Sequence, residues 1–148
     1  MIGGSETMKD VSNGQRALWM ALITSLAAPF LASLIVVAIS LAGPLADYVL
    51  PPRGDTSLGE VAINAFAWSA LPATVAALGL VPFVLQHGSY TWLQAAVAGV
   101  LGFAAGAIIF PLPDGGSPPV LAFLAGLLAI GMRAILIGGG ILRETVDQ

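Results

Sequence analysis

Arg133 is a charged residue inside the last of four long apolar segments, where a charge is unusual. It is the fourteenth of the 23 residues from Val120 to Leu142, where an arginine costs about 2.5–3.5 kcal/mol on insertion scales. Three interpretations are open: the guanidinium reaches the membrane surface or a backbone carbonyl, it lines a path for an anion or substrate, or it meets an acidic residue of a partner subunit. We favour the first, structural role.

Prolines supply candidate hydrogen-bond acceptors for this arginine. Three of them lie inside the first two apolar segments: Pro29, Pro72 and Pro82. Each lacks an N–H and releases the carbonyl four residues earlier, so a helix kink is predicted one turn before each proline. Counted inward at about 1.5 Å per residue, the carbonyls of Ser25 and Leu78 lie nearly as deep as Arg133. We therefore expect Arg133 to donate to one or both of them.

Other side chains with reactive chemistry are scarce. The chain has no cysteine and one histidine, His87, which excludes disulfides, thiolate catalysis and paired-histidine haem ligation within one chain. We expect no catalytic residues, no metal site and no cofactor. His87 follows the second apolar segment in a short polar turn, where a solvated interfacial role is the first interpretation and pH sensing the alternative.

Small residues recur at helical spacing in the last two apolar segments. Ala98, Gly102 and Gly106 stand four residues apart, and Ala122 and Gly126 repeat the spacing further on. Such a stripe lets another backbone approach closely, which is a main source of helix association in lipid. Packing within one chain and association between chains both use this device, and we favour packing within the chain.

Long uncharged segments indicate which kind of secondary structure must position these residues. No charged side chain occurs in the 53 residues between Glu60 and Asp114, and charged residues make up 9% of the chain against 57% hydrophobic. The mean hydropathy is +0.94. A water-soluble domain of this size needs charge on its exposed faces, so lipid must surround most of the chain. In lipid, a helix satisfies the hydrogen bonds of its own backbone. A β-barrel would need segments of alternating polarity, which this sequence lacks.

We predict an all-α integral membrane protein with four transmembrane helices in a compact bundle, the first two kinked by proline. The helices are expected at about 17–43, 61–85, 92–111 and 119–142. The first segment is too long for the apolar region of a signal peptide, so we expect it to be retained. Residues 17–142 form the membrane domain, 1–16 a flexible cytoplasmic tail, and 143–148 a second cytoplasmic tail.

Basic residues predict the orientation. Lys9, Arg16 and Arg143 lie on the side of the termini, and Arg53 lies on the opposite side. By the positive-inside rule both termini are cytoplasmic. The loop over residues 44–60 then faces outward. We expect the chain to reside in a bacterial cytoplasmic (inner) membrane.

These features predict a small non-catalytic membrane protein, an accessory or scaffold subunit that packs with other membrane helices. The alternative is a small transporter or channel with Arg133 near its path. It would have to be a homo-oligomer, because four short helices enclose too little volume for a solute. The absence of a carboxylate inside the apolar segments argues against proton coupling. The expected partners are the lipid bilayer and either other membrane subunits or further copies of the chain. Charge is too sparse for nucleic acid.

Overall fold

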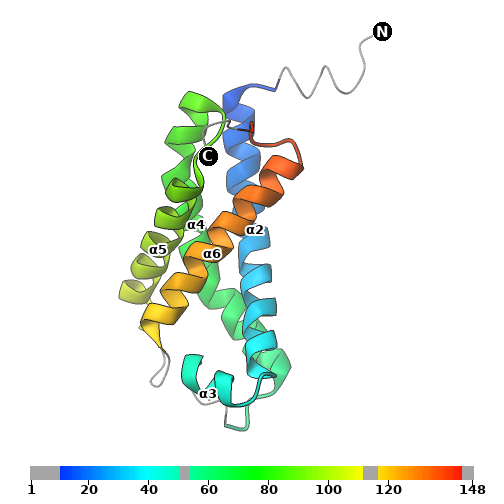
Figure 1. Ribbon diagram of the computed structural model, residues 1–148, viewed down its shortest axis with the longest axis vertical. Helices are drawn as coiled ribbons and strands as arrows, with labels where there is room; N and C mark the ends of the chain where they lie inside the picture. Colours follow the sequence, from blue (N-terminus) through cyan, green and yellow to red (C-terminus); the bar gives the residue numbers. More distant parts are fainter. Residues whose placement is uncertain (1–10, 51–53, 112–116, 145–148) are drawn as a thin grey trace.

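The computed structural model describes residues 11–50, 54–111 and 117–144, which form an all-helical bundle (Figure 1). Its elements are α2 (Asn13–Ser40), α3 (Pro44–Val49), α4 (Leu58–His87), α5 (Trp92–Ile109) and α6 (Pro118–Gly138). Four of them, α2, α4, α5 and α6, are long and apolar enough to cross a membrane. The predicted fold class, an all-α membrane bundle of four helices, is confirmed.

Three of the long helices begin with the same reciprocal cap. The side chains of Ser12, Ser57 and Thr91 each accept from the backbone N–H three residues later, and Gln15, Glu60 and Gln94 at those positions accept from the capping residue's own N–H. Each cap satisfies two N–H groups that the first helical turn leaves without a partner. The cap at Ser12 starts α2 at Asn13, so the prediction that residues 13–16 belong to a tail is wrong. The predicted tails at residues 1–10 and 145–148 lie outside the described residues.

The last transmembrane helix ends earlier than predicted, at Gly138. Gly140 adopts a positive φ of 76°, which glycine reaches without steric cost. The N–H groups of Ile141 and Leu142 then both donate to the carbonyl of Leu136, at 2.9 and 3.2 Å. The chain therefore folds back after α6, and Leu142 is buried in the bundle.

The helices pack in chain order. α2 runs along α4, α4 along α5 and α5 along α6, while α6 meets α2 over a shorter contact. Figure 1 shows α6 crossing the bundle diagonally and ending beside the beginning of α2. The described ends of the chain therefore lie at one end of the bundle, and α3 lies at the other. We call the first the terminal end.

Helix α5 has 18 residues against 30 in α4, and it ends before the opposite end of the bundle is reached (Figure 1). Beyond its last residue, the carbonyl of Phe110 accepts from Trp68 Nε1 at 3.3 Å, and the rings of Trp68 and Phe103 lie 5.4 Å apart. Trp68 thus packs between α4 and α5. From there back to its first residue, Leu58, α4 continues for about 15 Å beyond the end of α5.

The core lies near the terminal end and takes residues from all four long helices and two connections. It consists of Ala17, Met20, Ala77, Leu80, Val84, Tyr90, Ala95, Leu136 and Leu142. In the 18-residue apolar stretch of each long helix, only 17 to 28% of the residues are buried. Most of the apolar surface therefore faces outward. That is the distribution expected where lipid is the solvent. Pro29, Pro72 and Pro82 lie inside continuous helices, and the kinks remain predictions.

Candidate functional site

Arg133 lies closer to the membrane surface than its place in the sequence indicated. It is the sixteenth of the 21 residues of α6, five residues before the end of the helix, or about 7.5 Å. Its Nε donates to the carbonyl of Tyr90 at 2.6 Å. The acceptor for Nε is therefore neither of the expected carbonyls, those of Ser25 and Leu78. The difference arises because residues 139–142 fold back instead of continuing the helix, which moves Arg133 toward the terminal end.

The acceptor of this bond belongs to the short connection between α4 and α5. Gly88 ends α4 with a φ of 73°, and Ser89 and Tyr90 are only 2% and 3% exposed. The sequence indicated a polar link at the membrane surface, but the link is covered by the ends of α2 and α6. We call residues 88–90 the α4–α5 turn.

A second arginine joins the start of α2 to the end of α6. Arg16 is 6% exposed, and its Nη1 donates to the carbonyls of Gly140 and Ile141 at 3.2 and 2.8 Å. These carbonyls follow the last turn of α6, where the helix leaves carbonyls without intrahelical partners. A cation is also favoured there by the helix dipole. Arg16 therefore closes the bundle between its first and last helices.

A third arginine covers the α4–α5 turn. The backbone N–H of Arg143 donates to the carbonyl of Gly88 at 3.1 Å, and Asn13 Nδ2 donates to the carbonyl of Leu85 at 3.1 Å. A Cβ built on Gly88 would lie 2.9 Å from both Arg143 Cδ and Asn13 Oδ1. Position 88 therefore favours glycine for its positive φ, and a larger residue would also displace the side chains of Arg143 and Asn13.

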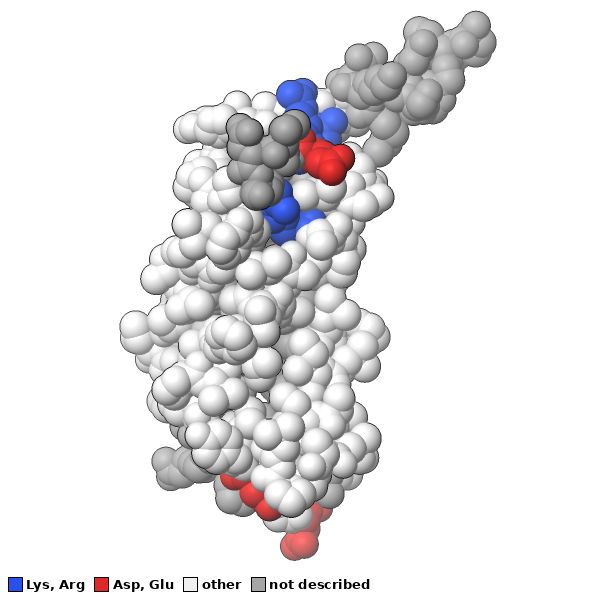
Figure 2. Space-filling view, viewed as in Figure 1, with Lys and Arg blue, Asp and Glu red and all other residues white. Residues whose placement is uncertain are grey.

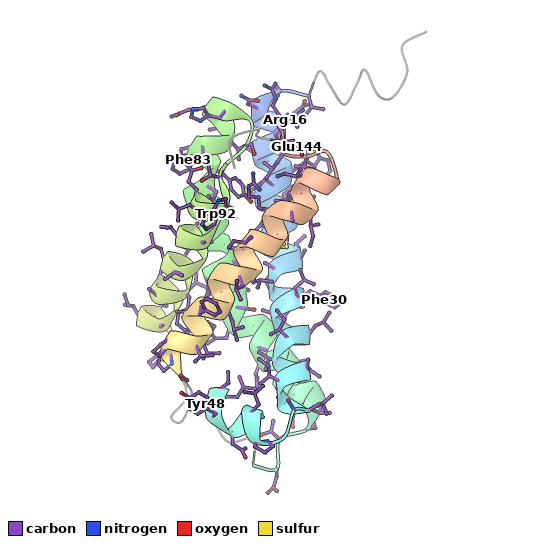
Figure 3. The ribbon with its side chains drawn as sticks, viewed as in Figure 1. Arg16, Phe30, Tyr48, Phe83, Trp92 and Glu144 are labelled. Atoms are coloured by element: carbon purple, nitrogen blue, oxygen red, sulfur yellow. The ribbon has the colours of Figure 1, made fainter. Side chains whose placement is uncertain are left out.

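Together Arg16, Arg133 and Arg143 form what we call the arginine collar. Each contacts either the α4–α5 turn or the end of α6. Figure 2 shows the basic side chains of the described residues gathered at the terminal end beside an acidic side chain, while other acidic side chains lie at the opposite end. In Figure 3 Arg16 and Glu144 lie at the terminal end and Tyr48 at the other. The collar holds two chain reversals in place at the terminal end of the bundle.

Burial and the collar act in opposite directions on the phenol of Tyr90. Burial raises its pKa from 10.0 to about 12, because the phenolate would lose water, and the positive charge of Arg133 lowers the pKa by a smaller amount. The phenol is therefore neutral at physiological pH.

The small residues of α5 face neighbouring helices of the same chain. A Cβ on Gly102 would lie 2.5 Å from the carbonyl oxygen of Pro72, and one on Gly106 would lie 2.6 Å from Pro72 Cγ. Gly99, which the sequence analysis did not select, faces α6: its Cβ would lie 2.6 Å from the carbonyl oxygen of Ala125. Thus α5 approaches the α4 backbone at Gly102 and the α6 backbone at Gly99.

The remaining members of the predicted stripe are placed less closely. A Cβ on Gly126 would lie 3.4 Å from Val100 Cγ2, which is ordinary contact distance. Ala98 is partly buried against the core, and Ala122 is half-buried. The residues predicted from their spacing therefore contribute unequally to helix packing. Spacing alone does not show which face of a helix is turned toward its neighbour.

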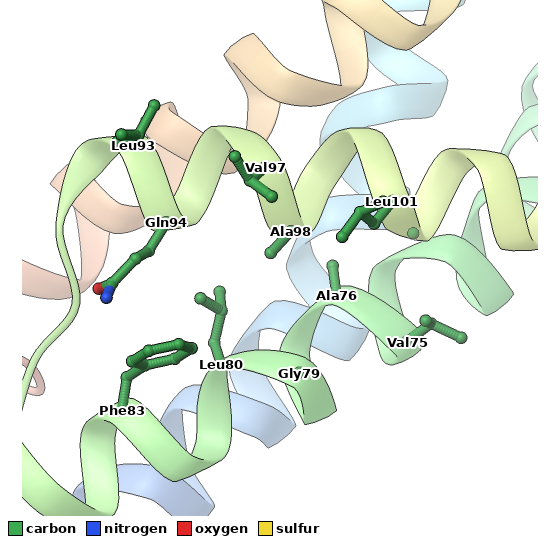
Figure 4. A pocket seen from close by; sticks show the side chains of 11 residues that line it. Val75, Ala76, Gly79, Leu80, Phe83, Leu93, Gln94, Val97, Ala98 and Leu101 are labelled. Carbon is green, nitrogen blue, oxygen red and sulfur yellow. The ribbon is translucent and has the colours of Figure 1, made fainter.

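An apolar groove of about 470 Å³ runs between α4 and α5 (Figure 4). Glycine and alanine supply four of its lining residues, Ala76, Gly79, Ala98 and Gly102. Gln94 is the polar residue of the lining, and its side-chain carbonyl already accepts from the N–H of Thr91 at 2.8 Å. A smaller apolar groove between α2 and α4 is lined by Ser33, Ala62, Ile63, Phe66 and Ala67. Neither groove is lined by a residue of the arginine collar.

The sequence contains local signals for part of the collar. The spacing of Ser12 and Gln15 is that of a capping box, which would have placed Arg16 in the first turn of a helix. The positive φ of Gly88 and Gly140 fits glycines that end helices. The meeting of the α4–α5 turn with the end of α6 had no such signal, because it depends on how the helices cross. Comparisons with protein-family models, curated proteins and solved structures give no match for the chain.

Proposed function

We propose that the chain is a small non-catalytic membrane protein, an accessory or scaffold subunit that packs with other membrane helices. The groove between α4 and α5 carries this proposal. Its lining includes Gly79, which is exposed and where a Cβ would meet nothing within 4 Å. A second backbone can therefore approach α4 closely at this position, and close packing drives helix association in lipid. The proposed occupant is a transmembrane helix of a partner subunit.

The polar groups of the described residues support a structural role. Ser12, Ser57 and Thr91 cap helices, and the side chains of Arg16 and Arg133 donate to backbone carbonyls. A homo-oligomeric transporter or channel with Arg133 near its path remains the alternative. It has less support, because both grooves are apolar and lie away from the collar.

We further propose that both termini are cytoplasmic and that the chain resides in a bacterial cytoplasmic (inner) membrane. The orientation is supported by the arginine collar, which lies at the terminal end, since basic residues favour the cytoplasmic side. The proposed partners are the bilayer and other membrane subunits, and not nucleic acid.

The test compares two glycines that have open space around them. A Cβ at Gly79 or at Gly131 would meet nothing within 4 Å, so Gly79→Leu and Gly131→Leu both leave the packing of the bundle intact. Gly79 lines the groove and Gly131 does not. After purification of the tagged full chain in mild detergent, we expect a stoichiometric membrane partner with the parent and with Gly131→Leu. We expect its loss with Gly79→Leu, because leucine fills the groove.

Two other outcomes would contradict the proposal. A partner that binds both variants equally would remove the groove as the docking site. A pure homo-oligomer that conducts a solute in vesicles would replace the accessory role with the transporter role.

A further inference from the structure

Gln94 brings a polar side chain into the apolar groove between α4 and α5. It belongs to the cap of α5: its backbone N–H donates to Thr91 Oγ1 at 3.1 Å, and its Oε1 accepts from the N–H of Thr91 at 2.8 Å. These reciprocal bonds hold the side chain against the first turn of the helix. They also fix the orientation of the amide, because Nε2 in the place of Oε1 would set two donors against each other.

The other end of this amide is a hydrogen-bond donor. Nε2 carries two N–H groups, and they have no acceptor within the part of the chain that the structure describes. Figure 4 shows the amide of Gln94 extending from α5 toward Phe83 of α4, and both residues line the groove. The groove therefore contains a donor whose position is already fixed, so little side-chain freedom is lost when it binds an acceptor.

The surroundings of Gln94 make this donor a selective group. The lining is otherwise apolar, with large side chains such as Leu80, Phe83 and Val97. A polar group covered by apolar side chains costs free energy unless an acceptor reaches it. A helix that lay in the groove would cover Gln94, and it would have to supply that acceptor itself.

We propose that the partner helix in this groove carries a hydrogen-bond acceptor opposite Gln94 Nε2, the side-chain oxygen of a carboxamide, a hydroxyl or a carboxylate. The inference rests on the proposed docking of a partner helix and adds the chemistry by which that helix is chosen. Gly79 allows a second backbone to approach α4 closely, whereas Gln94 selects the helix and its register. A wholly apolar helix would cover the amide without satisfying it, so the groove discriminates against such helices.

The experiment uses the full chain in phosphatidylcholine vesicles and two synthetic transmembrane peptides of leucine and alanine as probes. One peptide carries a methionine near each end, and the other carries methionine sulfoxide at the same places. The two differ in acceptor oxygens and not in donors or charge. Energy transfer between the labelled chain and a labelled peptide measures binding. We expect the sulfoxide peptide to bind the parent about threefold to tenfold more tightly, and Gly79→Leu to abolish the binding of both peptides.

Two substitutions of Gln94 remove the donor, and Gln15 provides a matched control for each. Gln15 caps α2 as Gln94 caps α5, but it does not line the groove. Gln94→Glu keeps the cap, since Glu60 already accepts from the N–H of Ser57 in the same way, at 2.9 Å. We expect Gln94→Glu to prefer the methionine peptide, because acceptor then faces acceptor, and Gln94→Leu to show no preference. Gln15→Glu and Gln15→Leu should keep the preference of the parent.

The outcomes separate this inference from the proposed function. If both peptides bind equally to the parent while Gly79→Leu abolishes their binding, the groove docks helices but Gln94 does not select them, and the inference is wrong. It is also wrong if Gln94→Leu keeps the preference for the sulfoxide peptide. Binding that survives Gly79→Leu, or no binding of either peptide, removes the groove as a docking site and overturns both proposals.

Discussion

An arginine in an apolar helix needs both a short path to the membrane surface and an acceptor. Arg133 has both, because α6 ends five residues later and the α4–α5 turn offers the carbonyl of Tyr90. A charge-assisted hydrogen bond contributes about 1.5–3 kcal/mol, and the insertion cost falls away from the bilayer centre. The two effects together offset the insertion cost.

Replacing Arg133 by leucine should destabilise the bundle although it removes a charge from an apolar helix. The carbonyl of Tyr90 would lose its donor, and a buried acceptor left without a partner costs about 1–3 kcal/mol. Unfolding in a mixed-detergent titration measures the loss, with Ala134→Leu at an exposed position of the same helix as the control. A variant Arg133→Leu as stable as the parent would show that this bond does not hold α6 to the α4–α5 turn.

Tyr90 gives the fold an alkaline limit. Its pKa is raised to about 12 from 10.0, so between these values the folded chain keeps a proton that the unfolded chain has released. The stabilisation is complete below pH 10 and falls as pH rises toward 12, by roughly 2–3 kcal/mol in all. In Tyr48→Phe, Tyr90 is the single tyrosine, and its phenolate absorbance should appear near pH 12. Appearance near pH 10 would mean that the phenol is open to solvent.

At the scale of elements, α5 packs between α4 and α6 and has glycines where it contacts each of them. Gly102 faces the backbone of α4 and Gly99 faces that of α6, so α5 can approach both neighbours at once. Dispersion and backbone contacts replace the hydrophobic effect that is missing between helices in lipid.

The same substitution should have opposite effects at two glycines. Gly102→Ala places a methyl group 2.5 Å from the carbonyl oxygen of Pro72, and overpacking of this kind costs about 1–3 kcal/mol. Gly131→Ala, in open space on α6, should stabilise by about 0.5–1 kcal/mol through helix propensity. Thermal unfolding of both variants in one detergent gives the comparison. Equal shifts would remove the close approach at Gly102 from the account of stability.

The helices could be predicted because their causes are local. Uncharged runs gave the four transmembrane segments, and the Ser12 and Ser57 caps were present in the sequence as starting signals. The short helix α3 was not predicted: it has proline at its first position but no side-chain cap, and six residues give little periodicity. The acceptor of Arg133 was also missed, because it depends on helix rotation and on the reversal after Gly138.

At the scale of the whole molecule, the two ends of the bundle differ. The terminal end holds the core, the arginine collar and all four long helices, whereas the opposite end is formed by α2, α4 and α3. The long helices α2 and α4 have 28 and 30 residues, or about 42 and 45 Å, against about 30 Å of hydrocarbon. They must tilt or extend past the membrane, and α5, with 18 residues, does not extend with them.

This difference between the ends gives a direct test of orientation, because the chain has no cysteine of its own. Asp55→Cys and Gln86→Cys place single thiols at exposed positions near opposite ends of α4. If the arginine collar faces the cytoplasm, an impermeant thiol reagent should label Asp55→Cys in intact cells and Gln86→Cys only after lysis. The reverse pattern would place the collar outside. The positive-inside rule would then fail for this chain, and the bonds that Arg16 and Arg133 make to backbone carbonyls would be the remaining explanation for their place at the terminal end.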